Sequence, residues 1–145
     1  MAKPESTFIA SVHRKLSPKP WAEKNHNAYR GGTPDVFYSG LSGCLWIEYK
    51  WITIPVRALI EPALSPLQRD WLYCRYHEGR NVAVIIGCPE GGVLLRTPAA
   101  WNRSKTPEYF RRLLRSREQL AQYIIQAVGA RCVTSSRPFS TQRTP

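Results

Sequence analysis

The sequence predicts an α/β fold in which a mixed central β-sheet is flanked by helices. Apolar residues recur at helical spacing near the N-terminus and in the C-terminal third, whereas short apolar or alternating runs lie between them. A segment with helix-start signals separates the first group of strand-like runs from the second. The order helix, strands, helix, strands, helix favours one sheet covered by helices, because each amphipathic helix needs an apolar surface to pack on.

The helices are predicted from periodicity and from start signals. They are expected over residues 4–16, over residues 65–78, from Thr106-Pro107 onward, and over residues 116–128. In the first, Phe8 and Val12 share one apolar side. In the second, Ser65 suits the N-cap and Gln68 completes a capping box, with Pro66 between them at the first helical position.

The strands are predicted from short apolar runs bounded by turn residues. They are expected over residues 21–29 (the weakest), 35–39, 44–51, 82–86 and 93–95. Gly40 and Gly43 flank a short connection between the second and third of these, which is typical of a hairpin. The stretch over residues 51–63 is too irregular to assign, because it contains Pro55 and Pro62.

Length and charge indicate one soluble, basic domain. With 145 residues the chain has room for one core, which we place at residues 1–133, followed by a disordered basic tail at residues 134–145. The 21 Lys and Arg against 10 Asp and Glu give a net charge of +11, which attracts nucleic-acid phosphates.

The cysteines form no close pair, so a structural zinc site is not expected, and three of the four lie in apolar segments. No run reaches transmembrane length, and a reducing cytoplasmic location (that of the host, if the protein is viral) is expected.

A carboxylate and an amine interrupt the apolar run over residues 44–51. Period-two alternation places Glu48 and Lys50 on one face of that strand, and the hairpin can bring Asp35 near Glu48. Carboxylates that converge at a strand edge suit Mg²⁺ or Mn²⁺, and the Tyr49 carbonyl could add a ligand. Lys50 would then orient a metal-bound water or stabilise charge on phosphorus. The alternative is a solvated polar face of an amphipathic strand; the neighbouring Trp46 argues against it, because it indicates burial.

These residues resemble a known family. Gly32-Thr33-Pro34-Asp35 followed by Glu48-Tyr49-Lys50 is similar to the motif of the PD-(D/E)xK nuclease superfamily, with the closest similarity to small VRR-NUC and Holliday-junction-resolvase-like nucleases, many of them viral. The resemblance implies a restriction-endonuclease-like core, Asp35 and Glu48 as metal ligands, and Lys50 as the catalytic lysine. It also implies Glu5 as an auxiliary metal-site acid and Gln68 near the active site. The stretch over residues 51–63 departs from the family pattern.

Several residues keep two interpretations. Glu5 is either a first-turn acid that favours the helix dipole or a carboxylate aimed into the site. Gln68 is either a capping residue or a site residue as well. His26 either contacts phosphate or belongs to the polar surface, and Trp51 either stacks on a base or packs in the core, with the core favoured. His13 is expected to be solvated, opposite the apolar side of its helix.

The sequence therefore predicts a Mg²⁺- or Mn²⁺-dependent endonuclease that hydrolyses DNA phosphodiesters and selects branched or structured DNA, such as a Holliday junction. Phosphate contacts are expected from basic residues that flank the site: Lys24, His26, Arg30, Arg111, Arg112 and Arg115. Because both strands of a branch must be cut, a C2 homodimer is expected. The alternative is a catalytically silent protein with a nuclease fold that binds DNA or acts as an inhibitor.

Overall fold

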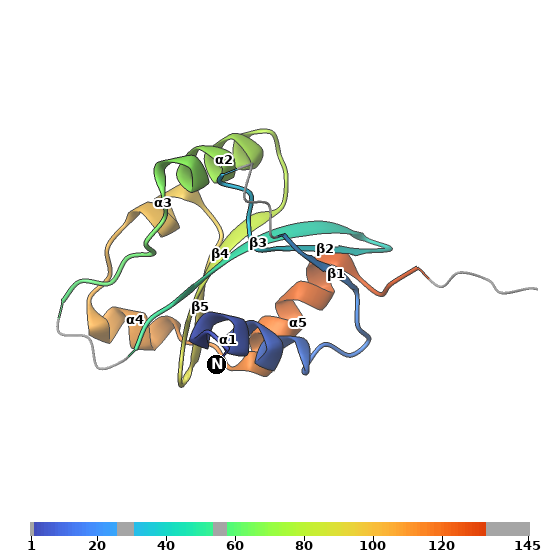
Figure 1. The fold of residues 1–145 in the computed structure, drawn as a ribbon, viewed down its shortest axis with the longest axis horizontal. Helices are drawn as coiled ribbons and strands as arrows, with labels where there is room; N and C mark the ends of the chain where they lie inside the picture. Colours follow the sequence, from blue (N-terminus) through green and yellow to red (C-terminus); the bar gives the residue numbers. More distant parts are fainter. Residues whose placement is uncertain (1, 26–30, 54–57, 133–145) are drawn as a thin grey trace, which may run out of the picture.

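The computed structural model describes residues 2–25, 31–53 and 58–132. Its helices are α1 Pro4–His13, α2 Pro66–His77, α3 Pro98–Asn102, α4 Pro107–Leu113 and α5 Arg117–Val128. Its strands are β1 Trp21–Lys24, β2 Val36–Gly40, β3 Gly43–Trp51, β4 Val82–Cys88 and β5 Gly91–Leu95. The predicted α/β class, a mixed sheet flanked by helices, is confirmed (Figure 1).

The strands form one five-stranded sheet in the order β1-β2-β3-β4-β5. Neighbours pair antiparallel except β3 and β4, which are parallel. A parallel pair needs a crossover on one face of the sheet, and α2 lies in that connection. Every residue of β4 is buried, as expected for a strand covered on both faces.

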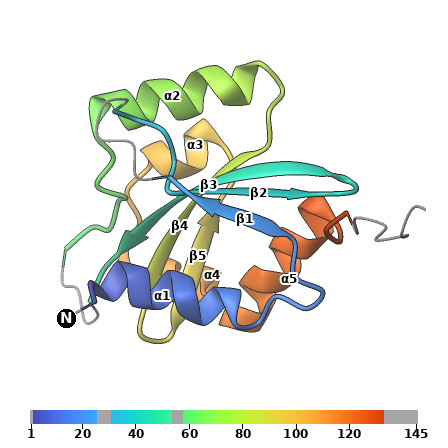
Figure 2. The same cartoon turned by 45° about the vertical axis from the view of Figure 1, so that its right-hand side comes forward.

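Helices cover both faces of the sheet and create two cores (Figures 1 and 2). One core joins α1 and α5 to side chains of β2, β3 and β4, among them Tyr38, Tyr49 and Ile85. The other joins α2, α3 and α4 to β4 and β5, with Leu72, Trp101 and Phe110 fully buried. Alternate β3 residues therefore face different environments, which allows polar residues on one face while the other is packed.

The β2–β3 hairpin is held in register by the end of α5. The backbone N–H groups of Leu41 and Ser42 donate to the carbonyls of Ala130 and Val128, both at 2.8 Å. A Cβ at Gly40 would collide with the Val128 carbonyl oxygen, so this close approach requires glycine. The hairpin register in turn places β2 against the first half of β3, from Gly43 to Ile47.

The structure corrects some sequence expectations. The short α3 was missed, and β4 and β5 extend further than predicted. His13 is half-buried rather than solvated, and its Nε2 lies 2.7 Å from the Tyr38 hydroxyl, because α1 packs across β2 and β3. Of the cysteines, Cys88 is buried and the other three are exposed. Residues 133–145, with the predicted tail, lie outside the described part. None of the helices in that part is both long and apolar enough to span a bilayer.

Candidate active site

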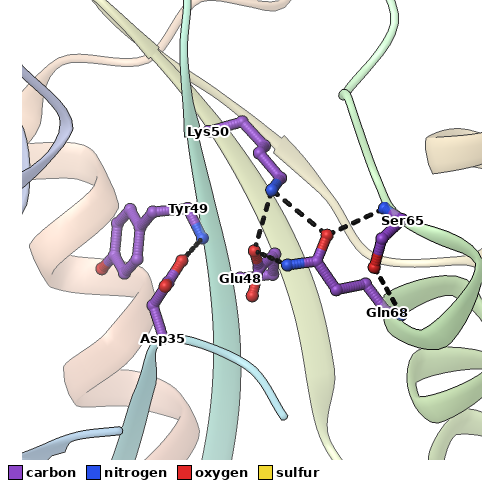
Figure 3. A network of polar contacts seen from close by, with 6 residues as sticks. All are labelled: Asp35, Glu48, Tyr49, Lys50, Ser65 and Gln68. Carbon is purple, nitrogen blue, oxygen red and sulfur yellow. Dashed lines mark hydrogen bonds and ion pairs between the residues drawn. The ribbon is translucent and has the colours of Figure 1, made fainter. Parts of the chain in front are cut away.

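Asp35 and Glu48 meet across the β2–β3 hairpin. Val36 pairs with Ile47, so Asp35, one residue before β2, stands opposite Glu48. Its Oδ2 accepts a 2.8 Å hydrogen bond from the backbone N–H of Tyr49 (Figure 3). The main chain of β3 thereby fixes the Asp35 carboxylate beside the segment that carries Glu48 and Lys50. The hairpin thus places Asp35 beside the segment from which Glu48 is predicted to act, and its role as a metal ligand stays a prediction.

Glu48 is a buried carboxylate with only one oxygen engaged. Its side chain is 2% exposed, and its Oε1 accepts from Lys50 Nζ at 3.1 Å and from Gln68 Nε2 at 2.7 Å. Its Oε2 is buried and has no hydrogen-bond partner among the described residues. Burial raises the pKa of Glu48 to about 7; the neighbouring Asp35 raises it further, and Lys50 lowers it through its charge and its hydrogen bond. The negative charge is therefore incompletely compensated.

Lys50 and Gln68 complete a network that links β3 to α2. Figure 3 shows Glu48 and Lys50 pointing toward α2, whereas the Tyr49 ring points to the opposite face of β3. Gln68 Oε1 accepts from Lys50 Nζ at 3.2 Å and from the Ser65 backbone N–H at 2.9 Å. The Ser65 hydroxyl accepts from the Gln68 backbone in return, so the capping box is present. Gln68 therefore caps the start of α2 and also contacts Glu48 and Lys50.

Glu5 is the third carboxylate in this region. It lies in the first turn of α1 and is half-buried. Burial raises its pKa, Asp35 raises it further, and Lys50 and Lys3 lower it. Because Glu5 is electrostatically coupled to Asp35 and Lys50, it belongs to the surroundings of the site as well as to the helix N-terminus.

The donor set fits a hard divalent cation in its chemistry. The charges of Glu5, Asp35 and Glu48 act on one another around a single site lysine, and one buried oxygen of Glu48 has no hydrogen-bond partner in the described part of the chain. A divalent cation would supply the missing positive charge and take oxygen ligands. Within the described ranges, however, no three His, Cys, Asp or Glu side chains are already spaced around one point where an ion could sit. The side chains have the required chemistry but are arranged around Lys50 and Gln68.

The basic residues predicted to contact phosphate are distributed over several elements. Lys24 is exposed at the end of β1, and Arg111 and Arg112 are exposed on α4. Arg115 pairs through its backbone with Gly92 at the end of the sheet where β3 also ends. His26 and Arg30 lie outside the described residues. The Arg115 side chain lines a hollow with residues of α5, the helix on the face of the sheet opposite Glu48, and Arg111 and Arg112 lie on a helix that packs on β5, so the structure does not bring these arginines to the carboxylates.

Sequence reasoning did not single out Arg117 as a site residue. Its guanidinium lies 5.1 Å from the centre of the Phe8 ring, and its Nε donates to Ser11 Oγ at 2.7 Å. It therefore packs on α1, the helix that carries Glu5. No spacing in the sequence could have indicated this contact, because the two residues come from opposite ends of the chain.

The comparison with solved structures bears on the fold. No protein-family model matches the chain, and no curated protein matches it in sequence. Among solved structures, the Holliday junction resolvase Hjc of Archaeoglobus fulgidus, an archaeal hyperthermophile, matches with a TM-score of 0.57 and 14% identity. The match covers 83% of this chain and 97% of the resolvase. The narrower resemblance to VRR-NUC nucleases stays a prediction. This chain, a mixed five-stranded sheet flanked by helices, shares the fold of that resolvase.

Proposed function

We propose that this protein is a divalent-metal-dependent endonuclease that hydrolyses DNA phosphodiesters and selects branched or structured DNA. The observation that carries the proposal is the buried Glu48 carboxylate, whose second oxygen has no partner among the described residues, beside Asp35 and Lys50. A scaffold has little reason to retain such an uncompensated charge, whereas a metal site requires it. The shared resolvase fold and the net charge of +11 support the same function.

The roles of the residues follow from their positions. Asp35 and Glu48, with the Tyr49 carbonyl between the charged side chains, would hold Mg²⁺ or Mn²⁺, and Glu5 would add negative charge from α1. When bound, such an ion polarises a phosphoryl oxygen and lowers the pKa of its water ligand. The hairpin register fixes the backbones that carry both carboxylates, so the two ligands would come from neighbouring positions of one sheet.

Lys50 and Gln68 perform the remaining chemistry in this proposal. The Lys50 side chain is 20% exposed, so its ammonium can reach a phosphate while its stem stays packed. It would hold the attacking water and stabilise the negative charge that develops on phosphorus. Gln68 would keep Lys50 and Glu48 in position, since its amide contacts both.

A catalytically silent DNA-binding or inhibitory protein is the second candidate. The observation in its favour is that the carboxylates of the described residues are not already spaced around one point. Against it stands the complete set of Asp35, Glu48 and Lys50 in one network. The two candidates differ in one measurable property, which is cleavage in the presence of Mg²⁺ or Mn²⁺.

A cleavage panel tests the proposal directly. Linear duplex, single strand, flap and four-way junction are incubated with the protein and Mg²⁺ or Mn²⁺, and cutting of the branched substrates that EDTA stops is expected. Asp35→Asn and Lys50→Ala should abolish cleavage and retain DNA binding, whereas Glu23→Gln, a change at an exposed acid on β1, should cut normally. Absence of cleavage by the wild type with either metal, or cleavage at the wild-type rate by both site variants, would refute it.

The homodimer is a separate proposal on quaternary structure. Cutting both strands of a branch symmetrically requires two sites related by a two-fold axis. Sedimentation of the protein alone and with a four-way junction measures this. A single protomer on each junction together with paired cuts would contradict it.

A further inference from the structure

A hollow of about 610 Å³ lies behind β3, on the face opposite Glu48 and Lys50. Its wall is built from α1, the last residue of β3 and the first residue of α5, and α1 and α5 lie side by side in Figures 1 and 2. Trp51, which directly follows Lys50, lines it, and so does Thr7, in the same turn of α1 as Glu5. The hollow therefore adjoins the candidate active site around the end of one strand.

The hollow is positively charged. Arg14, Lys15 and Arg117 line it together with the hydroxyl of Ser11, and none of its described lining residues is acidic. Beside the hollow, Glu118 pairs with Lys15 at 3.1 Å, and both side chains are largely exposed. Such an exposed pair is weak and is readily replaced by a phosphate.

One of these cations is held rigidly. Arg117 donates through Nε to Ser11 Oγ at 2.7 Å and through a terminal nitrogen to the Pro89 carbonyl at 3.2 Å, and its guanidinium packs over the Phe8 ring. These contacts already restrict the Arg117 side chain in the folded protein. Binding a planar or anionic group to it therefore costs little further side-chain entropy. The Trp51 ring lies 5.8 Å from the Phe8 ring, centre to centre, and stays partly exposed. The hollow thus combines a fixed cation with an accessible aromatic surface.

We propose that this hollow binds an unpaired nucleotide of the DNA strand next to the phosphate that is cut. The nucleotide base would stack on Trp51, and its phosphate would contact Arg14, Lys15 and Arg117. Its volume lies within the range of pockets that hold small ligands, and aromatic rings beside cations are how proteins bind single strands without reading sequence. The inference rests on the proposed function and deepens it, because a pocket for an unpaired nucleotide gives a physical basis for selecting branched over intact duplex DNA.

Binding without cleavage tests the pocket independently of catalysis. In EDTA, fluorescence anisotropy is measured with a blunt duplex and with the same duplex carrying a short single-stranded tail. Trp51→Leu, which keeps apolar volume in the wall, is expected to weaken binding of the tailed duplex about 5- to 100-fold and of the blunt duplex less than about 2-fold. Trp21→Leu, at an exposed tryptophan on β1, should leave both unchanged.

Charge removal and crosslinking supply readouts that do not depend on Trp51. Arg14→Gln is expected to reduce the salt dependence of tailed-duplex binding by about one ion, whereas Arg80→Gln, at an exposed arginine beyond α2, should not. A bromodeoxyuridine placed in the tail should crosslink to a peptide containing Trp51 when irradiated. Free thymidine monophosphate should compete only weakly, because it lacks the neighbouring phosphates.

The outcomes separate the two proposals. Preference for the tailed duplex that is lost in Trp51→Leu supports the pocket, even if no metal restores cleavage and the proposed function fails. Equal affinity for both duplexes, or a crosslink only to peptides away from α1 and Trp51, overturns the pocket while leaving metal-dependent cleavage standing. Tight binding of the free nucleotide without preference for the tail would assign the hollow to a small molecule and would also overturn it.

Discussion

Glu48→Gln is expected to stabilise the metal-free protein at pH 8. The wild type then keeps an ionised carboxylate in a site where its side chain is 2% exposed. Burial and the neighbouring Asp35 disfavour the ionised form of Glu48, and Lys50 offsets this only in part. The Gln amide has nearly the same shape and can still accept from Lys50 and Gln68, so the substitution removes the charge and keeps the packing.

The magnitude follows from the shift in pKa. The pKa of Glu48 rises from 4.5 to about 7, and each unit corresponds to 1.36 kcal/mol, so the ionised form is disfavoured in the fold by about 3 kcal/mol. The new amide nitrogen takes the place of the oxygen without a partner, and leaving that nitrogen unsatisfied costs about 1 kcal/mol. A net gain of about 2 kcal/mol remains, which corresponds to an increase in Tm of about 4 to 8 °C for a domain of this size.

The pH dependence has a defined sign. Because the folded-state pKa of Glu48 is raised, the folded protein binds more protons than the unfolded chain between pH 4.5 and about 7. The wild type therefore loses stability as the pH rises through this window, and the variant does not. The stability advantage of the variant should be largest at pH 8 and should be lost by pH 4.5, where the charge contribution is nearly gone and only the cost of about 1 kcal/mol for the unsatisfied amide remains.

Urea unfolding in EDTA, followed by circular dichroism at several pH values, measures this difference, with Glu23→Gln as the exposed control. Adding Mg²⁺ should stabilise the wild type and should have little effect on Glu48→Gln, since the variant lacks the ligand. If the variant were no more stable than the wild type in EDTA at pH 8, or if their difference did not depend on pH, the carboxylate would be compensated in the fold and the reasoning would fail.

Three further substitutions have separate consequences. Burial, followed by Lys24 and Lys19, lowers the pKa of His13 to about 4, so protonation of His13 should contribute a loss of about 1 to 2 kcal/mol between pH 6.5 and 4, after allowance for partial exposure; thermal melts should show it as a stability difference between the wild type and His13→Gln that changes by this amount over the same range. Leu72→Ala should lower the free energy of unfolding by about 2 to 5 kcal/mol in urea, because the side chain is fully buried between α2 and β4. Gln68→Ala should slow the cleavage step about 10-fold or more in single-turnover assays without weakening DNA binding, because the side chain positions Lys50 and Glu48.

The parts of the site that the sequence predicted depend on residues close to one another along the chain. Period-two alternation placed Glu48 and Lys50 on one face of β3, and the hairpin register brought Asp35 opposite Glu48. The capping-box pattern fixed the start of α2. Each of these depends on local geometry, which a single sequence encodes directly.

The parts that were missed depend on contacts between distant segments. His13 was expected to be solvated because it lies off the apolar side of α1, yet its ring is within hydrogen-bond distance of the Tyr38 hydroxyl on β2. The helix α3 begins with the start signal Thr97-Pro98, but its five residues are too few to show helical periodicity, and the burial of Trp101 holds it in place. The pairing of Arg117 with α1 likewise needs the packed fold. Tertiary packing decides these features, and periodicity alone does not carry that information.

The capping box of α2 has a consequence for how the site communicates with the rest of the molecule. One amide group of Gln68 satisfies the Ser65 backbone and also contacts Glu48 and Lys50. A change in the position of Glu48 on ligand binding therefore competes with the hydrogen bond that begins the helix. Local fraying of the first turn of α2 and occupancy of the site are thermodynamically linked, so amide hydrogen exchange at Ser65 reports on the carboxylates although Ser65 does not touch them.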